Sequence, residues 1–241
     1  MIVLGLDTAT ADTCVGLLSD TDGVPVRLSR HHRPAAGERP GHAEQLLRLT
    51  AELLHEASLT WTAVDRIAVG VGPGTFTGLR IGVASARALA QASGTQLAAV
   101  STLHALAQAA ASPAHADQPP PVLVCIDARR GEVFAGAWAG GRCVLPAQAT
   151  PPEALPALVA QLTADAGDEL LTVGDGAVRY RDAFDATAAT IPADDDLRHR
   201  VDGLAICALA RHAPAADRDT LMPDYVRAPD AKRRPRAGAT P

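Results

Sequence analysis

The stretch IVLGLDTATADTCVGLL (2–18) has a counterpart of equal length later in the chain, VLVCIDARRGEVFAGAW (122–138). Each is an apolar run that ends at an aspartate, followed by a polar loop and a second apolar run. This pattern predicts a strand, a turn and a returning strand. The offset is 120 residues both from Asp7 to Asp127 and from Gly16 to Gly136. We interpret the echo as a duplicated unit; the alternative is coincidence, because aspartate is common in turns.

The segments around the two hairpins predict an α/β chain. Apolar runs indicate further strands at 24–30, 64–71, 97–100, 142–145 and 170–173, and helical periods cover 43–57, 79–92, 103–111, 155–164 and 204–211. A proline-rich break at 112–121 is the best boundary. We therefore expect an N-terminal lobe over 1–111, a C-terminal lobe over 112–212 and an extension over 213–241. The extension ends in a basic cluster, Lys232, Arg233, Arg234 and Arg236.

Composition narrows the class of protein. The chain has 241 residues, a formal charge of −5 and 47% hydrophobic residues, which is typical of a globular protein and excludes a disordered or fibrous one. The negative charge argues against a stand-alone nucleic-acid binder. Four widely spaced cysteines, no membrane-length apolar run and no signal-peptide pattern predict a cytoplasmic protein with reduced thiols.

The glycine-rich stretch 72–82 carries no standard nucleotide motif. No Gly-Lys-Ser/Thr follows it, and Lys232 is the only lysine of the chain. Its spacing also differs from the dinucleotide-binding fingerprint. The start of the following helix would still attract an anion, with Arg80 in the first turn.

Two helices have faces suited to close packing. The 43–57 helix carries leucines, and the next helix has a small residue at every fourth position. Such faces fit either a partner protein or the chain's own sheet, and both interpretations stay open. The candidate contact residues are Leu46, Leu47, Leu53, Leu54, Gly78, Gly82, Ala86 and Ala90.

Conventional catalytic patterns are missing. The run DTAT (7–10) resembles the first phosphate loop of actin-like and sugar-kinase ATPases, which makes Asp7, Thr8 and Thr10 cofactor candidates beside Arg80. The usual glycine is absent, which argues for weak or lost hydrolysis; alternatively Asp7 only caps a turn. We expect no metal site, since the residue four after His42 is Leu46, and we expect His31 and His32 in a solvated loop. The run 127–132 predicts a salt-bridged turn or a phosphate-binding pair of arginines.

Taken together, six segments resemble one family, TsaB (also called YeaZ). They are DTAT (7–10), HAEQLL (42–47), GVGPGTFTGLRIG (70–82), DARRGEVF (127–134), GDGA (174–177) and PDYVR (223–227). The resemblance covers about residues 1–230. It implies an actin-like ATPase (ASKHA) fold with two lobes, each a mixed β-sheet flanked by helices.

The resemblance also implies a function. TsaB is the non-catalytic, dimerising subunit of the complex that makes N6-threonylcarbamoyladenosine beside the anticodon of tRNAs reading codons that begin with A. Its partners are the catalytic subunit TsaD and the ATPase TsaE, and tRNA is the substrate of the complex. No tightly bound cofactor is implied on this chain, although ATP or ADP at the subunit interface is compatible with it, as is a homodimer of the isolated protein. The competing hypotheses are an active ATPase or sugar kinase, and a peptidase.

Pairing in this family uses the two N-lobe helices. On that basis Gly82→Leu or Ala86→Arg is expected to abolish pairing with TsaD while leaving the fold soluble.

Overall fold

The computed structural model describes residues 1–20, 25–35, 37–111, 120–166 and 169–227. It contains two five-stranded sheets. The first is built from β1 (Ile2–Asp7), β2 (Thr13–Ser19), β3 (Val26–His32), β4 (Arg66–Gly72) and β5 (Gln96–Ser101). The second is built from β6 (Val122–Arg129), β7 (Glu132–Ala139), β8 (Arg142–Thr150), β9 (Leu170–Val173) and β10 (Ala189–Thr190).

The two sheets have the same topology. Their strand orders are β3-β2-β1-β4-β5 and, written in the matching direction, β8-β7-β6-β9-β10. In each, the first strand pairs antiparallel with the next and parallel with the strand beyond the following helix. The hairpin echo in the sequence therefore corresponds to a repeated fold, and the two-lobed α/β architecture is confirmed.

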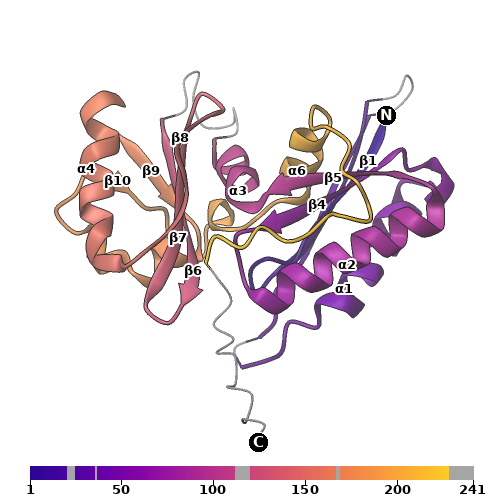
Figure 1. Cartoon of the computed structure of the whole chain (residues 1–241), viewed down its shortest axis with the longest axis horizontal. Coiled ribbons are helices and arrows are strands. Elements are labelled where there is room, and N and C mark those ends of the chain that lie inside the picture. Colours follow the sequence, from indigo (N-terminus) through magenta and orange to yellow (C-terminus); the bar gives the residue numbers. More distant parts are fainter. Residues whose placement is uncertain (21–24, 36, 112–119, 167–168, 228–241) are drawn as a thin grey trace, which may run out of the picture.

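Helices separate and cover the sheets (Figure 1). The outer face of the first sheet is covered by α1 (His42–Glu56) and α2 (Phe76–Ser93), and α4 (Leu155–Ala166) covers the outer face of the second. Between the sheets lie α3 (Thr102–Ala110) and α6 (Gly203–Ala210). Alternation along β6 sends Val124 toward these middle helices and Cys125 toward α4. The shorter helix α5 (Asp175–Arg179) follows β9.

Helix α6 lies against the sheet of the first lobe. Helix α6, expected in the C-terminal lobe, packs instead on β1 and β2, where glycines let the backbones touch. A Cβ on Gly203 would lie 2.2 Å from the Gly16 backbone nitrogen, and one on Gly5 would lie 2.6 Å from the Gly203 carbonyl oxygen. The Cys207 thiol donates to the Val3 carbonyl at 3.3 Å. The predicted C-terminal lobe over 112–212 thus includes a helix that lies against the first sheet, and backbone contacts with β1 and β2 set its position.

The last described segment also returns to the first lobe. The Ala216 amide donates to the Leu97 carbonyl, and the Asp224 amide donates to the Val71 carbonyl at 2.8 Å. The expected extension therefore lies along the first sheet and α2 up to Arg227. The basic cluster at 232–236 lies outside the described residues.

Local differences from the sequence prediction have simple causes. His31 and His32 belong to β3 and not to a loop, because both pair with β2. Helix α2 begins at Phe76, three residues before the predicted start at Leu79, and the Gly174–Gly176 turn runs directly into α5. Among the described helices, none combines the length and apolarity needed to cross a bilayer.

Candidate functional site

Asp7 is turned into the protein at the end of β1. The residue is 1% exposed; its Oδ1 accepts from the Ala9 amide at 2.7 Å and its Oδ2 accepts from the Thr102 hydroxyl at 2.8 Å. The Thr102 hydroxyl oxygen in turn accepts from the Gly72 amide at 3.2 Å. Burial raises the pKa of Asp7 to about 6, against the opposing effect of these hydrogen bonds. Asp7 therefore caps its own turn and ties β1 to the start of α3.

The Thr8 side chain is also hydrogen-bonded within the chain. Its hydroxyl donates to the Gly78 carbonyl at 2.7 Å. A Cβ on Gly82 would lie 2.4 Å from the same Thr8 hydroxyl oxygen. The turn after β1 thus rests on the first turns of α2, and the Thr75 amide donates to the Ala9 carbonyl at 2.7 Å. The side-chain oxygens of Asp7 and Thr8 are therefore hydrogen-bonded within the chain itself.

The turn of the second hairpin repeats this geometry, but its aspartate lies next to arginine side chains. Asp127 Oδ1 accepts from the Arg129 amide at 2.9 Å, as Asp7 accepts from Ala9. Its other oxygen lies 3.1 Å from the Arg129 guanidinium and 3.7 Å from that of Arg179. The predicted salt-bridged turn is present. Arg129 and Arg130 both have left-handed backbones, with φ of 61° and 56°.

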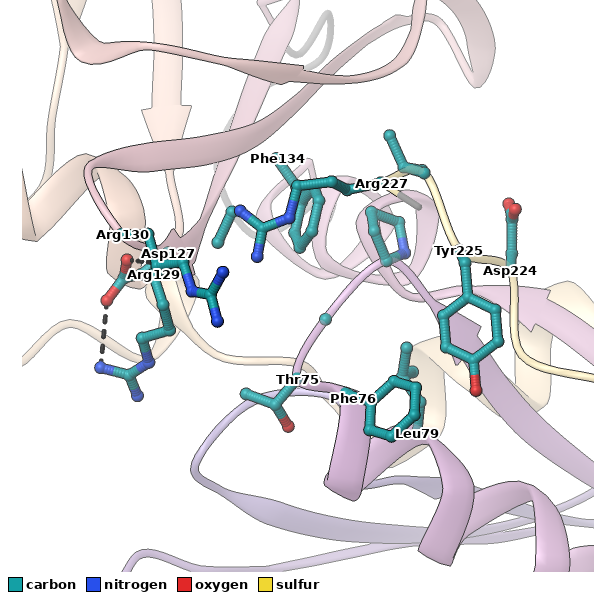
Figure 2. Close-up of a pocket in the computed structure, with 14 residues that line it drawn as sticks. Thr75, Phe76, Leu79, Asp127, Arg129, Arg130, Phe134, Asp224, Tyr225 and Arg227 are labelled. Atoms are coloured by element: carbon teal, nitrogen blue, oxygen red, sulfur yellow. Dashed lines mark hydrogen bonds and ion pairs between the residues drawn. The ribbon is translucent and has the colours of Figure 1, made fainter. Parts of the chain in front are cut away.

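The β6–β7 turn forms one wall of a groove of about 530 Å³ between the lobes (Figure 2). We call it the hairpin groove. The start of α2 and the returning segment before Arg227 form the other walls. Its lining comprises Pro73, Gly74, Thr75, Phe76, Leu79, Asp127, Ala128, Arg129, Arg130, Phe134, Asp224, Tyr225, Val226 and Arg227.

An aromatic cluster stands at the α2 side of the hairpin groove. The Phe76 and Tyr225 ring centroids are 5.6 Å apart, and the Arg80 guanidinium lies 3.8 Å above the centre of the Phe76 ring. Arg80 Nε also donates to the Tyr225 hydroxyl at 3.0 Å. Arg80 is therefore placed at the rim of this groove, away from the Asp7–Thr10 turn with which it was grouped as a cofactor candidate.

A second groove, of about 400 Å³, lies beside the first hairpin turn. Thr10 and Asp12 line it from the first lobe, and Asp175, His199 and Arg200 line it from the second. Arg200 Nε lies 3.8 Å from the Asp12 carboxylate across the lobes. Burial raises the pKa of Asp175 to about 6, although its carboxylate accepts from the Asp127 amide. The four cofactor candidates are thus divided among the buried turn, this groove and the hairpin groove.

His42 begins α1 and is buried. Its Nδ1 lies 2.8 Å from the Thr13 hydroxyl, and burial lowers its pKa, with the nearby His32 acting in the same direction. In the described part of the chain, no three His, Cys, Asp or Glu side chains are grouped closely enough to hold a metal ion.

The predicted contact residues of α1 and α2 are mostly buried within the chain. Leu46, Leu53 and Ala86 are 0% exposed. Their faces form the core of the first lobe against β1, β2 and β4. Seven of the eight are buried within the single chain, namely Leu46, Leu53, Leu54, Gly78, Gly82, Ala86 and Ala90, so that their contact with a partner stays a prediction. Leu47 alone of the set is exposed, at 50%.

Sequence reasoning missed the returning segment. Tyr225 and Arg227 belong to the PDYVR motif, but nothing local in the sequence indicates that they reach Phe76 and Glu132. The Arg227 guanidinium donates to the Glu132 carboxylate across 95 positions of chain. A contact of that sequence separation leaves no periodic signal in either segment.

The repeated sheets, the aspartate-capped hairpins and the two middle helices define the chain as a protein of the actin-like ATPase fold. A hexokinase of the ROK class from Thermus thermophilus shares that fold, with a TM-score of 0.51 at 14% identity over 88% of this chain and 98% of the kinase. The family model described as "TsaD: tRNA N6-adenosine threonylcarbamoyltransferase" matches residues 34–185.

Two relatives are more similar. YeaZ from Pseudomonas aeruginosa is 30% identical, with a TM-score of 0.74 over 93% of this chain and 99% of that one. The tRNA threonylcarbamoyladenosine biosynthesis protein TsaB of Escherichia coli is 34% identical over 139 residues, which cover 58% of this chain and 54% of that protein. The chain belongs to the TsaB/YeaZ family.

Proposed function

We propose that this protein is the non-catalytic partner subunit of a TsaD-type enzyme that makes N6-threonylcarbamoyladenosine in tRNA. It pairs with the catalytic subunit, activates it, and works with a TsaE-type ATPase in the cytoplasm. tRNA is the substrate of the complex and not of this chain alone. The relatives' names and the TsaD-type family match support the pathway.

The main observation for a non-catalytic role is that the side chains of the first hairpin turn are hydrogen-bonded within the chain. In a working phosphate loop the aspartate and neighbouring hydroxyl face the nucleotide. Here Asp7 binds Thr102 and Ala9, and Thr8 binds the Gly78 carbonyl. Freeing either side chain would leave buried partners unpaired, at about 1–3 kcal/mol each. This turn stabilises the lobe. On this proposal the chain binds no cofactor tightly, and ATP or ADP of the complex would lie at the subunit interface.

The partner surface proposed here is the outward side of α1 and α2. It replaces the buried faces predicted from the sequence. Leu47 is half exposed on α1, and Ala51 and Ala84 are exposed on α1 and α2. Small side chains flanking one exposed leucine permit a second helical pair to approach closely. The same surface would serve a homodimer of the isolated protein.

Reconstitution tests the function. TsaD, TsaE, ATP, threonylcarbamoyl-adenylate and unmodified tRNA are mixed with and without this protein, and modified adenosine is read by nucleoside mass spectrometry. We expect product only when this protein is present, and none from this protein with tRNA and adenylate alone. Equal product without it removes the proposed role. Rapid ATP turnover by the isolated protein would favour the ATPase hypothesis.

A matched pair of leucines tests the surface. Leu47→Arg is expected to abolish co-elution with TsaD and product formation, because a charge would be buried at the contact. Leu197→Arg is the control, since Leu197 is 72% exposed and lies in the second lobe. Equal co-elution of both variants would place the contact elsewhere.

A further inference from the structure

We infer that Phe76, Arg80 and Tyr225 bind a carboxylate side chain of the catalytic partner subunit at Arg80, with an apolar side chain of that subunit against Phe76. We call these three residues the ring cluster. The inference deepens the proposed function and rests on it, because it gives the chemistry of one contact beside the outward surface of α1 and α2.

The ring cluster adjoins the proposed partner surface. Arg80 and Ala84 are four residues apart on α2, so they are neighbours on one side of that helix, and both are exposed. Phe76 lies one turn before Arg80 and continues the same edge. A subunit that packs on α2 at Ala84 therefore lies next to the ring cluster.

Large apolar side chains are exposed along this edge. Phe76 is 45% exposed, although its ring lies against that of Tyr225. Met222 is 62% exposed and lies on the returning segment between Asp219 and Tyr225, which both accept hydrogen bonds from α2. With Leu47 on α1, these are three of the six large apolar side chains exposed in the described part of the chain. Exposed apolar side chains beside polar ones are typical of a contact with another protein.

The Arg80 guanidinium is held in place by its neighbours. It lies 3.8 Å from the centre of the Phe76 ring, and its Nε donates to the Tyr225 hydroxyl at 3.0 Å. Neither terminal nitrogen of Arg80 donates to another described residue. A planar guanidinium binds a carboxylate through two parallel hydrogen bonds. Because the side chain is already ordered, less conformational entropy is lost when the carboxylate binds.

The described part of the chain supplies no carboxylate of its own to Arg80. On the returning segment, Asp219 lies 3.7 Å from the Arg218 guanidinium, and the Asp224 carboxylate points away from the Phe76 ring in Figure 2. A guanidinium buried in a protein contact without an anion would weaken that contact. The partner that covers Ala84 is therefore expected to bring a carboxylate to Arg80.

Affinity for the TsaD-type catalytic subunit tests the inference. Isothermal titration calorimetry measures binding of the full chain to that subunit for Arg80→Gln, Phe76→Ala and Tyr225→Phe. Arg142→Gln is the control, because Arg142 is also an exposed arginine but begins β8 in the second lobe. Circular dichroism and thermal midpoints verify folding.

We expect the largest loss of affinity from Arg80→Gln, about thirtyfold, because the carboxylate of the partner would be left buried without its counter-charge. Phe76→Ala should weaken binding about tenfold. Tyr225→Phe should weaken it about threefold, since its hydroxyl only positions Arg80. Arg142→Gln should leave the affinity unchanged. Equal affinities of Arg80→Gln and Arg142→Gln would overturn the inference.

Zero-length cross-linking tests for the carboxylate directly. Lys232 is the only lysine of the chain, so Arg80→Lys adds one new side-chain amine, at the ring cluster. A carbodiimide joins an amine to a carboxylate in contact with it, and mass spectrometry identifies the linked residues. We expect a link from position 80 to an aspartate or glutamate of the catalytic subunit, and none from position 142 in Arg142→Lys. A complex that forms without a link at position 80 would overturn the inference.

Reconstitution separates this inference from the proposed function. If Arg80→Gln binds the catalytic subunit as the wild type does while product formation still requires the protein, only this inference fails. If Arg80→Gln reduces only the self-association of the isolated protein, the ring cluster contacts a second copy and the inference is overturned. If product forms equally without the protein, the proposed function fails and this inference fails with it.

Discussion

Replacing Asp7 by asparagine is expected to stabilise the protein at neutral pH. Burial raises the Asp7 pKa from its ordinary value of 3.8 to about 6, so the folded state favours the protonated carboxyl. The stabilisation from that proton is fully present below about pH 4 and is lost as the pH rises through about 6. Each unit of pKa difference is worth about 1.4 kcal/mol, so the buried charge costs about 3 kcal/mol at neutral pH.

Asparagine keeps the shape and the turn without the charge. Its oxygen can accept from the Ala9 amide, and its NH2 group can donate to the Thr102 hydroxyl oxygen. We therefore expect Asp7→Asn to exceed the wild type in unfolding free energy by about 3 kcal/mol near pH 7, and by under about 1 kcal/mol near pH 4.

Urea unfolding at a series of pH values measures this difference. The difference between variant and wild type is the observable, because Asp175 titrates in the same range in both proteins. A loss of stability at pH 7, or a difference that does not change with pH, would refute the desolvation argument. The variant should also still support tRNA modification in the reconstituted complex, which a catalytic aspartate would not permit.

The other predictions concern packing and one histidine. Gly203→Ala should lower the free energy of unfolding by about 3 kcal/mol, or the melting midpoint by about 6–12 °C, because its Cβ would overlap the Gly16 backbone; unchanged melting would contradict the contact. Ala86→Arg should yield insoluble protein, because Ala86 is buried and the substitution would place a charge in the core. This result differs from the soluble but unpaired variant expected from the sequence. Ala88→Arg, on the exposed side of the same helix, should remain soluble, and expression and gel filtration compare the two. Because burial lowers the His42 pKa, the contribution of His42 to stability is present above about pH 6.5 and is lost as the pH falls below that value. The difference in unfolding free energy between His42→Gln and the wild type should therefore move in favour of the variant on acidification, and parallel pH curves would show that His42 does not contribute.

Local sequence patterns were sufficient to predict most of the strands and helices. The run 170–173 is a strand over those same residues, and the 43–57 helix shifted by one position, because strongly periodic or apolar segments leave few alternatives. The two-lobed arrangement followed from the hairpin echo. The packing of α6 on the first sheet was not predicted, because it depends on contacts between segments almost 200 residues apart, such as Gly16 with Gly203.

The candidate site was only partly predictable. The sequence singled out Arg129 and Arg130 and the glycine-rich loop, each from a local pattern. It did not indicate which face of a helix turns inward, since a leucine face and a small-residue stripe suit a core and a partner equally well. The tertiary structure decided that question, and Leu46 and Ala86 went to the core.

The strand and helix pattern, the repeated aspartate turns and the family could all be inferred without a structure, because they depend on side-chain periodicity and on short motifs. The burial of Asp7, the position of α6 and the contact of Phe76 with Tyr225 became known from the folded chain alone. Those features depend on burial and on long-range contacts, which arise only when distant segments close around one another.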